Sequence, residues 1–188
     1  MANRDAATVV AVVVLGVLVA GASATAAPSD VVLHVTTYTQ VPARQFSDAR
    51  RAVVTLYARI GVQIVWAGGV AASAPADGAL HLDVILLNAA MAKRQQPNVA
   101  AFGQASHETK RAYIFCERVL DHAHLTGTDP GRMLGLVLAH EIGHMLLPRH
   151  SHTAIGLMKA EWFGTITAIP EFLPEQAETI RTLTSKRP

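Results

Sequence analysis

Two histidines and a glutamate lie within a single helical turn and could together perform hydrolytic chemistry. His140 and His144 are four residues apart, so both imidazoles project from the same helix face. That spacing lets both rings reach one zinc ion at ~2.0–2.1 Å. Glu141 follows the first histidine, where its carboxylate can take a proton from a zinc-activated water and pass it to a leaving amine. The sequence therefore predicts His140 and His144 as metal ligands and Glu141 as the general base.

The helix that carries these residues is apolar on nearly every other face. It runs from Pro130 to Leu147 and follows Asp129, a residue suited to cap the first turn. Such a helix is buried on most sides, and burying titratable side chains costs free energy unless something pairs them. A bound metal ion explains these side chains better than histidines that face solvent or form hydrogen bonds in the core.

The motif continues past the second histidine. Residues 140–158 resemble the zinc-binding consensus and Met-turn of the metzincin metallopeptidases, with matrix metalloproteinases as the nearest well-known comparison. Gly143 matches the glycine before the second histidine, and Met158 stands where that family has its Met-turn methionine. The stretch is also similar to a group of small secreted bacterial proteins. The resemblance implies a zincin-like fold, Zn²⁺ as the cofactor, and Met158 as a packing residue beneath the metal.

Two histidines after the helix are candidates for the third metal ligand. His150 fits the metzincin spacing, whereas His152 fits the spacing of the bacterial group. Metzincins have a turn-forming glycine where this chain has Leu147, and Pro148 favours an extended conformation for that residue. Without the glycine, the chain can turn back toward His140 and His144 more easily over the longer segment that ends at His152. We therefore expect His152 to be the third ligand, with His150 as the alternative.

The N-terminal segment has the order of residue types found in secretory signals. Arg4 precedes an apolar run over residues 6–20, and small residues fill positions 21–27. A signal peptide has this order: a positively charged start, an apolar segment and a cleavage site of small residues. Cleavage is expected after Ala24 or Ala26.

Residues 1–26 are therefore expected to be a signal peptide, and residues 27–188 one zincin-like metallopeptidase domain that is secreted or periplasmic. After cleavage we expect no stable membrane association. The alternative is a retained membrane anchor, because residues 6–29 carry no charge and are almost long enough to span a bilayer.

The composition is that of a packed globular protein. Of the 188 residues, 51% are hydrophobic and 16% are charged, and the net charge is +2. Lys and Arg are scattered with few aromatic residues among them, so we expect no nucleic-acid partner. Cys116 is the only cysteine, which excludes an intramolecular disulfide and a cysteine-based zinc site. We expect it to be a buried residue of a strand.

Strands and helices must hold the histidine helix in place. β-branched and apolar runs predict four strands, at residues 31–35, 62–66, 80–86 and 112–116. Helical spacing predicts two more helices, at residues 47–60, with Ser47 as the cap, and at residues 174–184. Residues 93–97 suit an exposed loop, and residues 100–103 suit a short edge strand.

This order of elements predicts an α+β fold of the zincin or metzincin type. We expect a twisted mixed sheet, the active-site helix packed beneath it, and a small C-terminal subdomain with the Met-turn and the last helix. The predicted activity is zinc-dependent hydrolysis of peptide bonds in a peptide or protein substrate. One alternative is an amidase or deacylase acting on a non-peptide amide. The other is a catalytically silent secreted zinc-binding module, against which the intact Glu141 argues.

Overall fold

The computed structural model describes residues 29–68, 78–95, 98, 100–161, 166 and 168–185. The expected signal peptide, residues 1–26, lies outside the described residues. Within the described parts of the chain, a five-stranded, mostly parallel sheet and several helices form a mixed α and β fold. Among the helices of those parts, none is both long enough and apolar enough to cross a bilayer.

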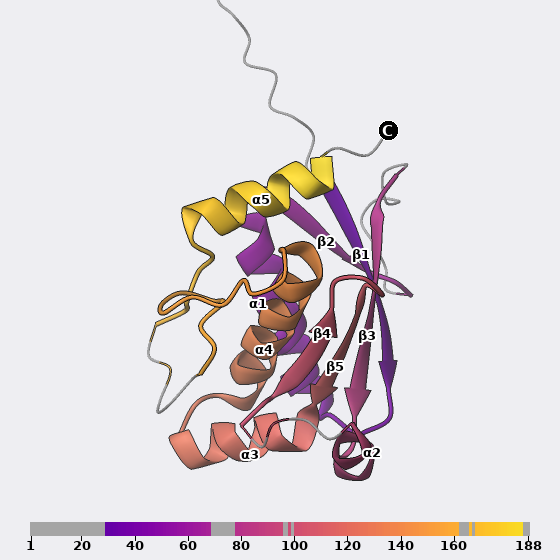
Figure 1. Cartoon of the computed structure of the whole chain (residues 1–188). Coiled ribbons are helices and arrows are strands. Elements are labelled where there is room, and N and C mark those ends of the chain that lie inside the picture. Colours follow the sequence, from indigo (N-terminus) through magenta and orange to yellow (C-terminus); the bar gives the residue numbers. More distant parts are fainter. Residues whose placement is uncertain are drawn as a thin grey trace, which may run out of the picture.

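The sheet has the strand order β2-β1-β3-β5-β4 (Figure 1). Four of its strands run parallel: β1 (Ser29–Thr37), β2 (Val62–Trp66), β3 (Leu80–Leu87) and β5 (Arg111–Phe115). These are the four strands that the apolar runs predict, because each of them contributes buried apolar residues to the core. The fifth strand, β4 (Gly103–Ser106), is antiparallel to β5 and forms one edge of the sheet. It begins three residues after the start of the expected edge strand.

Two long helices, α1 (Ala43–Ala58) and α4 (Pro130–Leu146), pack against each other on one face of the sheet (Figure 1). Their backbones approach closely at Gly135, where an added Cβ would lie 2.7 Å from the Cβ of Ala52. The Tyr57 hydroxyl of α1 donates a buried hydrogen bond to the carbonyl of Ala139, at 3.0 Å. Helix α1 therefore fixes the position of the helix that carries the histidines.

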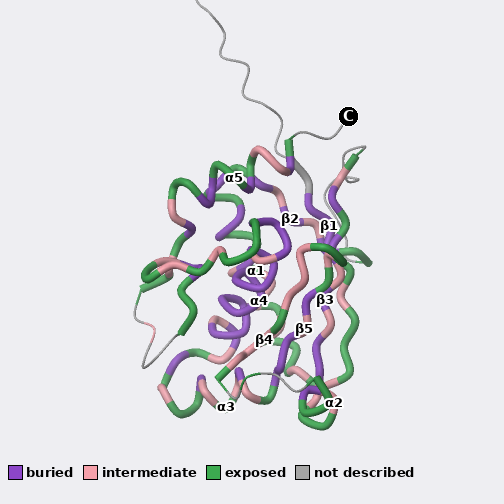
Figure 2. Tube along the Cα trace, viewed as in Figure 1, coloured by how far each residue is buried: buried purple, intermediate pink, exposed green. Residues whose placement is uncertain are grey.

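Helix α4 lies at the centre of the molecule and is buried along nearly its whole length (Figure 2). Its predicted cap is confirmed, because the Asp129 carboxylate accepts a hydrogen bond from the backbone N–H of Arg132, at 2.8 Å. The helix ends before Leu147, whose φ of −95° and ψ of 158° are extended. That conformation agrees with the restriction that Pro148 imposes on its predecessor.

The expected start of α1 is wrong, since the helix begins four residues before Ser47. Pro42 occupies the N-cap position, and its carbonyl accepts the first helical hydrogen bond from Phe46, at 3.0 Å. The Phe46 ring packs edge-on against Trp66, with ring centroids 6.0 Å apart. This ring contact stabilises the first turn, which has no side-chain cap.

Two short helices were not expected. Asn88 caps α2 (Ala89–Arg94) by accepting a hydrogen bond from the N–H of Met91, at 2.9 Å, so Lys93 and Arg94 are helical rather than in a loop. Cys116 is buried as expected, but it begins α3 (Cys116–Thr126) instead of lying in a strand. The apolar stripe of α3 is short and interrupted by polar residues, which weakens its periodic signal.

The C-terminal segment shares the main core instead of forming a core of its own. Helix α5 (Pro174–Ser185) lies across one end of the molecule, near the start of β1 (Figure 1). Its buried Ala177 and Ile180 belong to the same apolar cluster as Met158, α4 and the sheet. The expected small subdomain is therefore continuous with the rest of the fold.

Candidate metal centre

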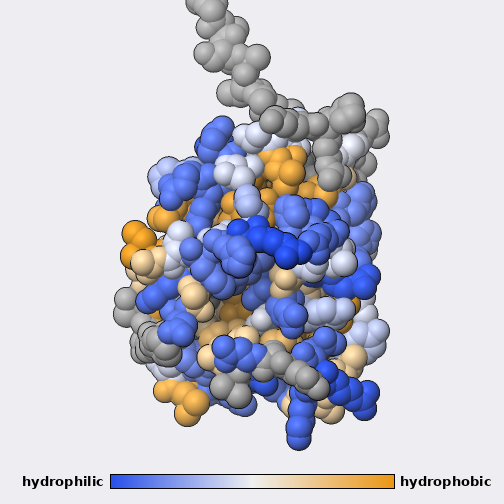
Figure 3. Space-filling view, viewed as in Figure 1, coloured by the Kyte–Doolittle hydropathy of each residue, from blue (hydrophilic) through white to orange (hydrophobic). Residues whose placement is uncertain are grey.

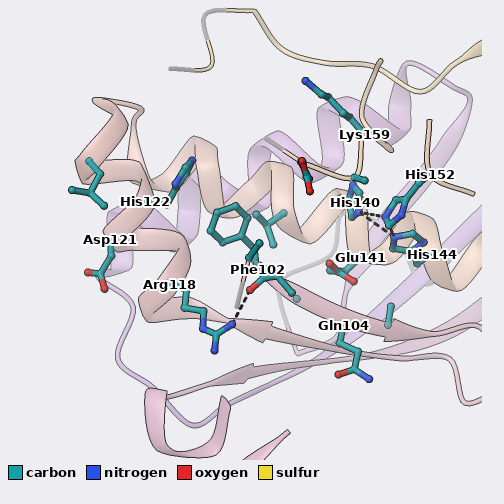
Figure 4. A pocket seen from close by; sticks show the side chains of 18 residues that line it. Phe102, Gln104, Arg118, Asp121, His122, His140, Glu141, His144, His152 and Lys159 are labelled. Carbon is teal, nitrogen blue, oxygen red and sulfur yellow. Dashed lines mark hydrogen bonds between the residues drawn. The ribbon is translucent and has the colours of Figure 1, made fainter. Parts of the chain in front are cut away.

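Three histidine side chains converge at the C-terminal half of α4 (Figure 4). The Nε2 atom of His144 lies 3.0 Å from that of His140 and 2.9 Å from that of His152. The Nε2 atoms of His140 and His152 are 3.3 Å apart. His140 is buried, His144 is half-buried and His152 is exposed, so the group lies between the core and solvent.

Hydrogen bonds on the outer nitrogens of two rings help to orient them, and one of these bonds fixes a tautomer. Nδ1 of His140 lies 2.8 Å from the carbonyl oxygen of Leu157, which can only accept, so this nitrogen carries the proton and Nε2 does not. Nδ1 of His144 lies 3.2 Å from the hydroxyl of Ser151. Such outer hydrogen bonds orient histidine ligands in metal sites. A tetrahedral zinc ion separates its nitrogen ligands by roughly 3.3 Å, so the three Nε2 atoms could hold a metal ion.

Burial keeps these histidines neutral, which is the form that binds metals. Burial lowers the pKa of His140 to about 4. The hydrogen bond to the Leu157 carbonyl raises this pKa by a smaller amount, and the neighbouring His152 lowers it slightly. Burial, followed by the neighbouring His140 and His152, lowers the pKa of His144 to about 3. Burial also lowers the pKa of His152. At neutral pH all three rings therefore offer a lone pair rather than a positive charge.

Glu141 lies beside the three histidines with its carboxyl group on the same cleft (Figure 4). The residue is 6% exposed, and burial raises the pKa of its carboxyl group to about 8. A nearby cation would favour the ionised form and lower that value again. The carboxyl group is therefore positioned to hold or release a proton next to the histidines.

The chain turns back to the histidine pair without the glycine that metzincins use. His150 takes a left-handed conformation with a φ of 61°, which costs a residue with a side chain about 1 kcal/mol or more. Its side chain is exposed and does not join the histidine group, whereas His152 does. Of the two candidates for the third ligand, the structure thus brings His152 to the site. That this residue binds a metal stays a prediction.

Met158 lies directly beneath the helix, where the resemblance expects it. A Cβ on Gly143 would lie 2.6 Å from the sulfur of Met158 and 3.2 Å from the ring of Phe172, so no larger residue fits there without a shift. The Met158 carbonyl accepts a hydrogen bond from the N–H of Thr153, at 3.0 Å. This loop brings the Leu157 carbonyl to the ring of His140.

The histidines line one end of a cleft of about 870 Å³. In the space-filling view it is a hollow with apolar side chains on its floor (Figure 3). One wall is a face of α3 with Arg118, Asp121, His122 and Leu125. A second wall is a face of α4 with Val137, His140, Glu141 and His144. The remaining walls are residues 100–105, which include most of β4, and residues 159–161 after the Met158 turn. A substrate longer than one residue would fit this cleft.

The β4 strand passes very close to Glu141. A Cβ on Gly103 would come within 2.6 Å of the Cγ atom of Glu141 and 2.7 Å of its carboxylate oxygen. Only a glycine at this position lets the strand backbone approach the carboxyl group so closely. The glutamate therefore lies directly beneath the edge of the sheet.

No model of a known protein family matches the chain, and no curated protein matches it. The metzincin resemblance therefore rests on residues 140–158, and the function has to be argued from the geometry of the site.

Several residues of the site carried no clear signal in the sequence. Lys110 lies at the turn between β4 and β5, and its ammonium group donates a hydrogen bond to the carbonyl of Met145, at 2.6 Å. Ser151 contacts His144, and Gly103 contacts Glu141. A glycine inside an edge strand could have indicated a close backbone approach. The contacts of Lys110 and Ser151 depend on folding and had no local pattern.

Proposed function

We propose that this protein is an exported zinc-dependent metallopeptidase with a zincin-like fold. The observation that carries the proposal is the convergence of three Nε2 atoms next to the buried carboxyl group of Glu141, within one cleft. Three neutral imidazoles suit zinc among the common metals. Three protein ligands also leave a position open for water or substrate, as in catalytic zinc sites, whereas structural sites have four.

His140, His144 and His152 would hold the ion. Zinc bound there would supply a water of lowered pKa and polarise a substrate carbonyl. Glu141 would take the proton from the attacking water on a carboxylate oxygen and deliver it to the nitrogen of the departing amine. Burial of Glu141 under β4 keeps competing solvent away from this transfer. The Leu157 carbonyl holds the ring of His140 in one tautomer throughout.

The edge of β4 supports a peptide as the substrate. Strand β4 pairs with β5 on one side only, so within the described residues its other side is free of a partner strand. An extended peptide can bind such an edge through main-chain hydrogen bonds and so pass over Glu141. A small non-peptide amide would gain nothing from this edge, which favours peptidase activity over the amidase or deacylase alternative.

A metal and activity measurement on the purified protein tests this function. Prepared without chelator, it should contain about one zinc ion per chain. It should cleave members of an internally quenched peptide library, lose this activity with 1,10-phenanthroline, and regain it when zinc is restored. Protein without zinc would contradict the proposal. Zinc-loaded protein that cleaves only acylated non-peptide amines would support the deacylase, and zinc-loaded protein that cleaves neither class would support the silent binding module.

Export is the second part of the proposal and rests on the N-terminal sequence. The charged start, apolar run and small residues before position 27 support removal of a signal peptide. The mass of the exported protein should correspond to a chain that begins near Thr25 or Ala27. An exported protein that keeps Met1 would favour the retained anchor.

A further inference from the structure

A second cavity, of about 650 Å³, shares no lining residue with the cleft of the histidines. It lies where the carboxyl ends of β1, β2 and β3 meet the start of α1. Its walls are largely apolar and include Val35, Val41, Phe46, Trp66 and Leu86. Thr37, Thr39, Gln40 and Arg50 supply its polar groups. The cavity therefore combines an apolar body with a few polar contacts, as small-molecule sites do.

The strand order places this cavity at a crossover point of the sheet. Strand β1 leads through α1 to β2 on one side, whereas β3 leads through α2 to β4 and β5 on the other side. The connections at the carboxyl ends of these strands thus diverge and open a crevice between them. Open sheets with parallel strands bind ligands at such crevices, outside the carboxyl ends of the strands.

The charge that lines the cavity is positive. Arg50 is the single charged residue among its described lining residues, and none of those is acidic. Arg44 and Arg51 on the same helix both pair with Asp48, but within the described chain Arg50 has no ion-pair partner. Its guanidinium group instead lies over the Trp66 ring, 5.0 Å from the centroid. This leaves a cation available to a ligand.

The start of α1 also favours an anion here. Helix α1 has no side-chain cap and no acidic residue in its first turn, so its N-terminal N–H groups keep their partial positive charge. Trp66, which is 8% exposed, has a buried indole N–H without a hydrogen-bond partner in the described part of the chain. Because the Trp66 side chain lines the cavity, the resonance of this N–H can report on a bound ligand.

We propose that this cavity binds a small organic carboxylate with an aromatic or branched aliphatic body. The carboxylate would pair with Arg50, and the apolar body would pack against the wall that Phe46 and Leu86 form. This site is separate from the metal centre, so the proposal stands or falls independently of the proposed peptidase activity.

Phenylacetate is a suitable probe, and the Trp66 indole resonance of the ¹⁵N-labelled full chain is a suitable reporter. A Trp162→Phe variant assigns that resonance, since the chain has two tryptophans. We expect phenylacetate to shift it to saturation with a dissociation constant on the order of millimolar, given the few atoms of the probe. Phenylacetamide, which has the same shape without the charge, should bind at least about tenfold more weakly. No saturable shift, or equal binding of the two compounds, would overturn the proposal.

Neighbouring arginines provide a matched pair of variants. Arg50→Gln should weaken phenylacetate binding by about tenfold or more, because it removes the charge-assisted contact. Arg51→Gln removes the same charge one residue away, from a side chain that is 71% exposed, and should leave binding unchanged. Arg50→Lys keeps the charge and should lose less affinity than Arg50→Gln. Equal effects of Arg50→Gln and Arg51→Gln would show that Arg50 does not contact the ligand.

Discussion

At the scale of single residues, the centre combines groups whose burial shifts their pKa values in opposite senses. Burial keeps His140 and His144 neutral well below their usual pKa and keeps Glu141 protonated well above its usual pKa. Neutral imidazoles are ready to bind a cation, and the cation would in turn favour ionised Glu141. In the proposed function, metal binding and formation of the general base would therefore be coupled.

Glu141→Gln should separate these two roles. The variant should bind as much zinc as the wild type, because it removes no ligand, and lose hydrolysis by about 10²–10⁴-fold, the usual contribution of a general base. Zinc content and turnover of both proteins, measured on one preparation, test this expectation. Wild-type turnover in Glu141→Gln would mean that another group moves the proton.

His150 and His152 are a natural pair for testing the third ligand. His152→Ala should lose most of the bound zinc and all measurable hydrolysis, because only two ligands remain. His150→Ala removes an exposed side chain outside the histidine group and should keep the zinc and most of the rate. Zinc stoichiometry and turnover of the two variants measure the difference. The reverse pattern would restore the metzincin spacing and refute the assignment of His152.

At the scale of elements, the β4–β5 hairpin is tied to the C-terminal end of α4. Lys110, at the start of β5, donates to the Met145 carbonyl, which lacks a helical partner at the end of α4. Glu108 in the same turn forms an ion pair with Arg149, just after the helix. These contacts tie the turn end of β4 to the end of α4 and so help to hold the strand at its distance from Glu141.

Lys110→Met should loosen this connection without touching a metal ligand. We expect a loss of about 1–2 kcal/mol in the free energy of unfolding, from the lost hydrogen bond and the lost positive charge at the helix C-terminus. Peptide hydrolysis should fall while zinc content stays the same. Urea unfolding and kinetics measure both effects, with Lys93→Met, which alters an exposed lysine on α2, as the control. Equal behaviour of the two variants would show that the hairpin contact does not position β4.

At the scale of the whole molecule, the buried histidines and Glu141 make the free energy of unfolding depend on pH. Without metal, His140 and His144 have folded pKa values of about 4 and 3 against 6.5 when unfolded, so their contribution to stability is lost as the pH falls below 6.5. Glu141 has a folded pKa of about 8 against 4.5, so its contribution is present below pH 4.5 and is lost as the pH rises through 8. The two titrations oppose each other between pH 4.5 and 6.5.

Glu141→Gln should therefore stabilise the metal-free protein at alkaline pH. Gln resembles the protonated carboxyl group at every pH, so the variant escapes the cost of ionising a buried group. We expect it to exceed the wild type by on the order of a few kcal/mol above pH 8, and to match it below pH 4.5. Unfolding in the presence of chelator at both pH values checks the sign. A constant difference at all pH values would mean that Glu141 does not titrate in the fold.

Much of the fold and half of the site follow from the sequence because they depend on local spacing. A separation of four positions places the rings of His140 and His144 on one helix face, and Asp129 followed by Pro130 marks the start of that helix. Apolar runs mark the four parallel strands because each strand contributes buried apolar residues to the core. The short helices α2 and α3 have too few turns for a clear period.

Tertiary structure alone decided the remaining contacts. The missing turn glycine and Pro148 favoured His152 over His150, but the left-handed turn at His150 and the distance from His152 to the other two rings appear only in the folded chain. Gly103 and Lys110 are far in sequence from Glu141 and Met145, and they meet only because β4 pairs with β5 above α4. Local pattern determines which face of an element a side chain occupies. The distance between two faces is determined by the packing of the whole chain.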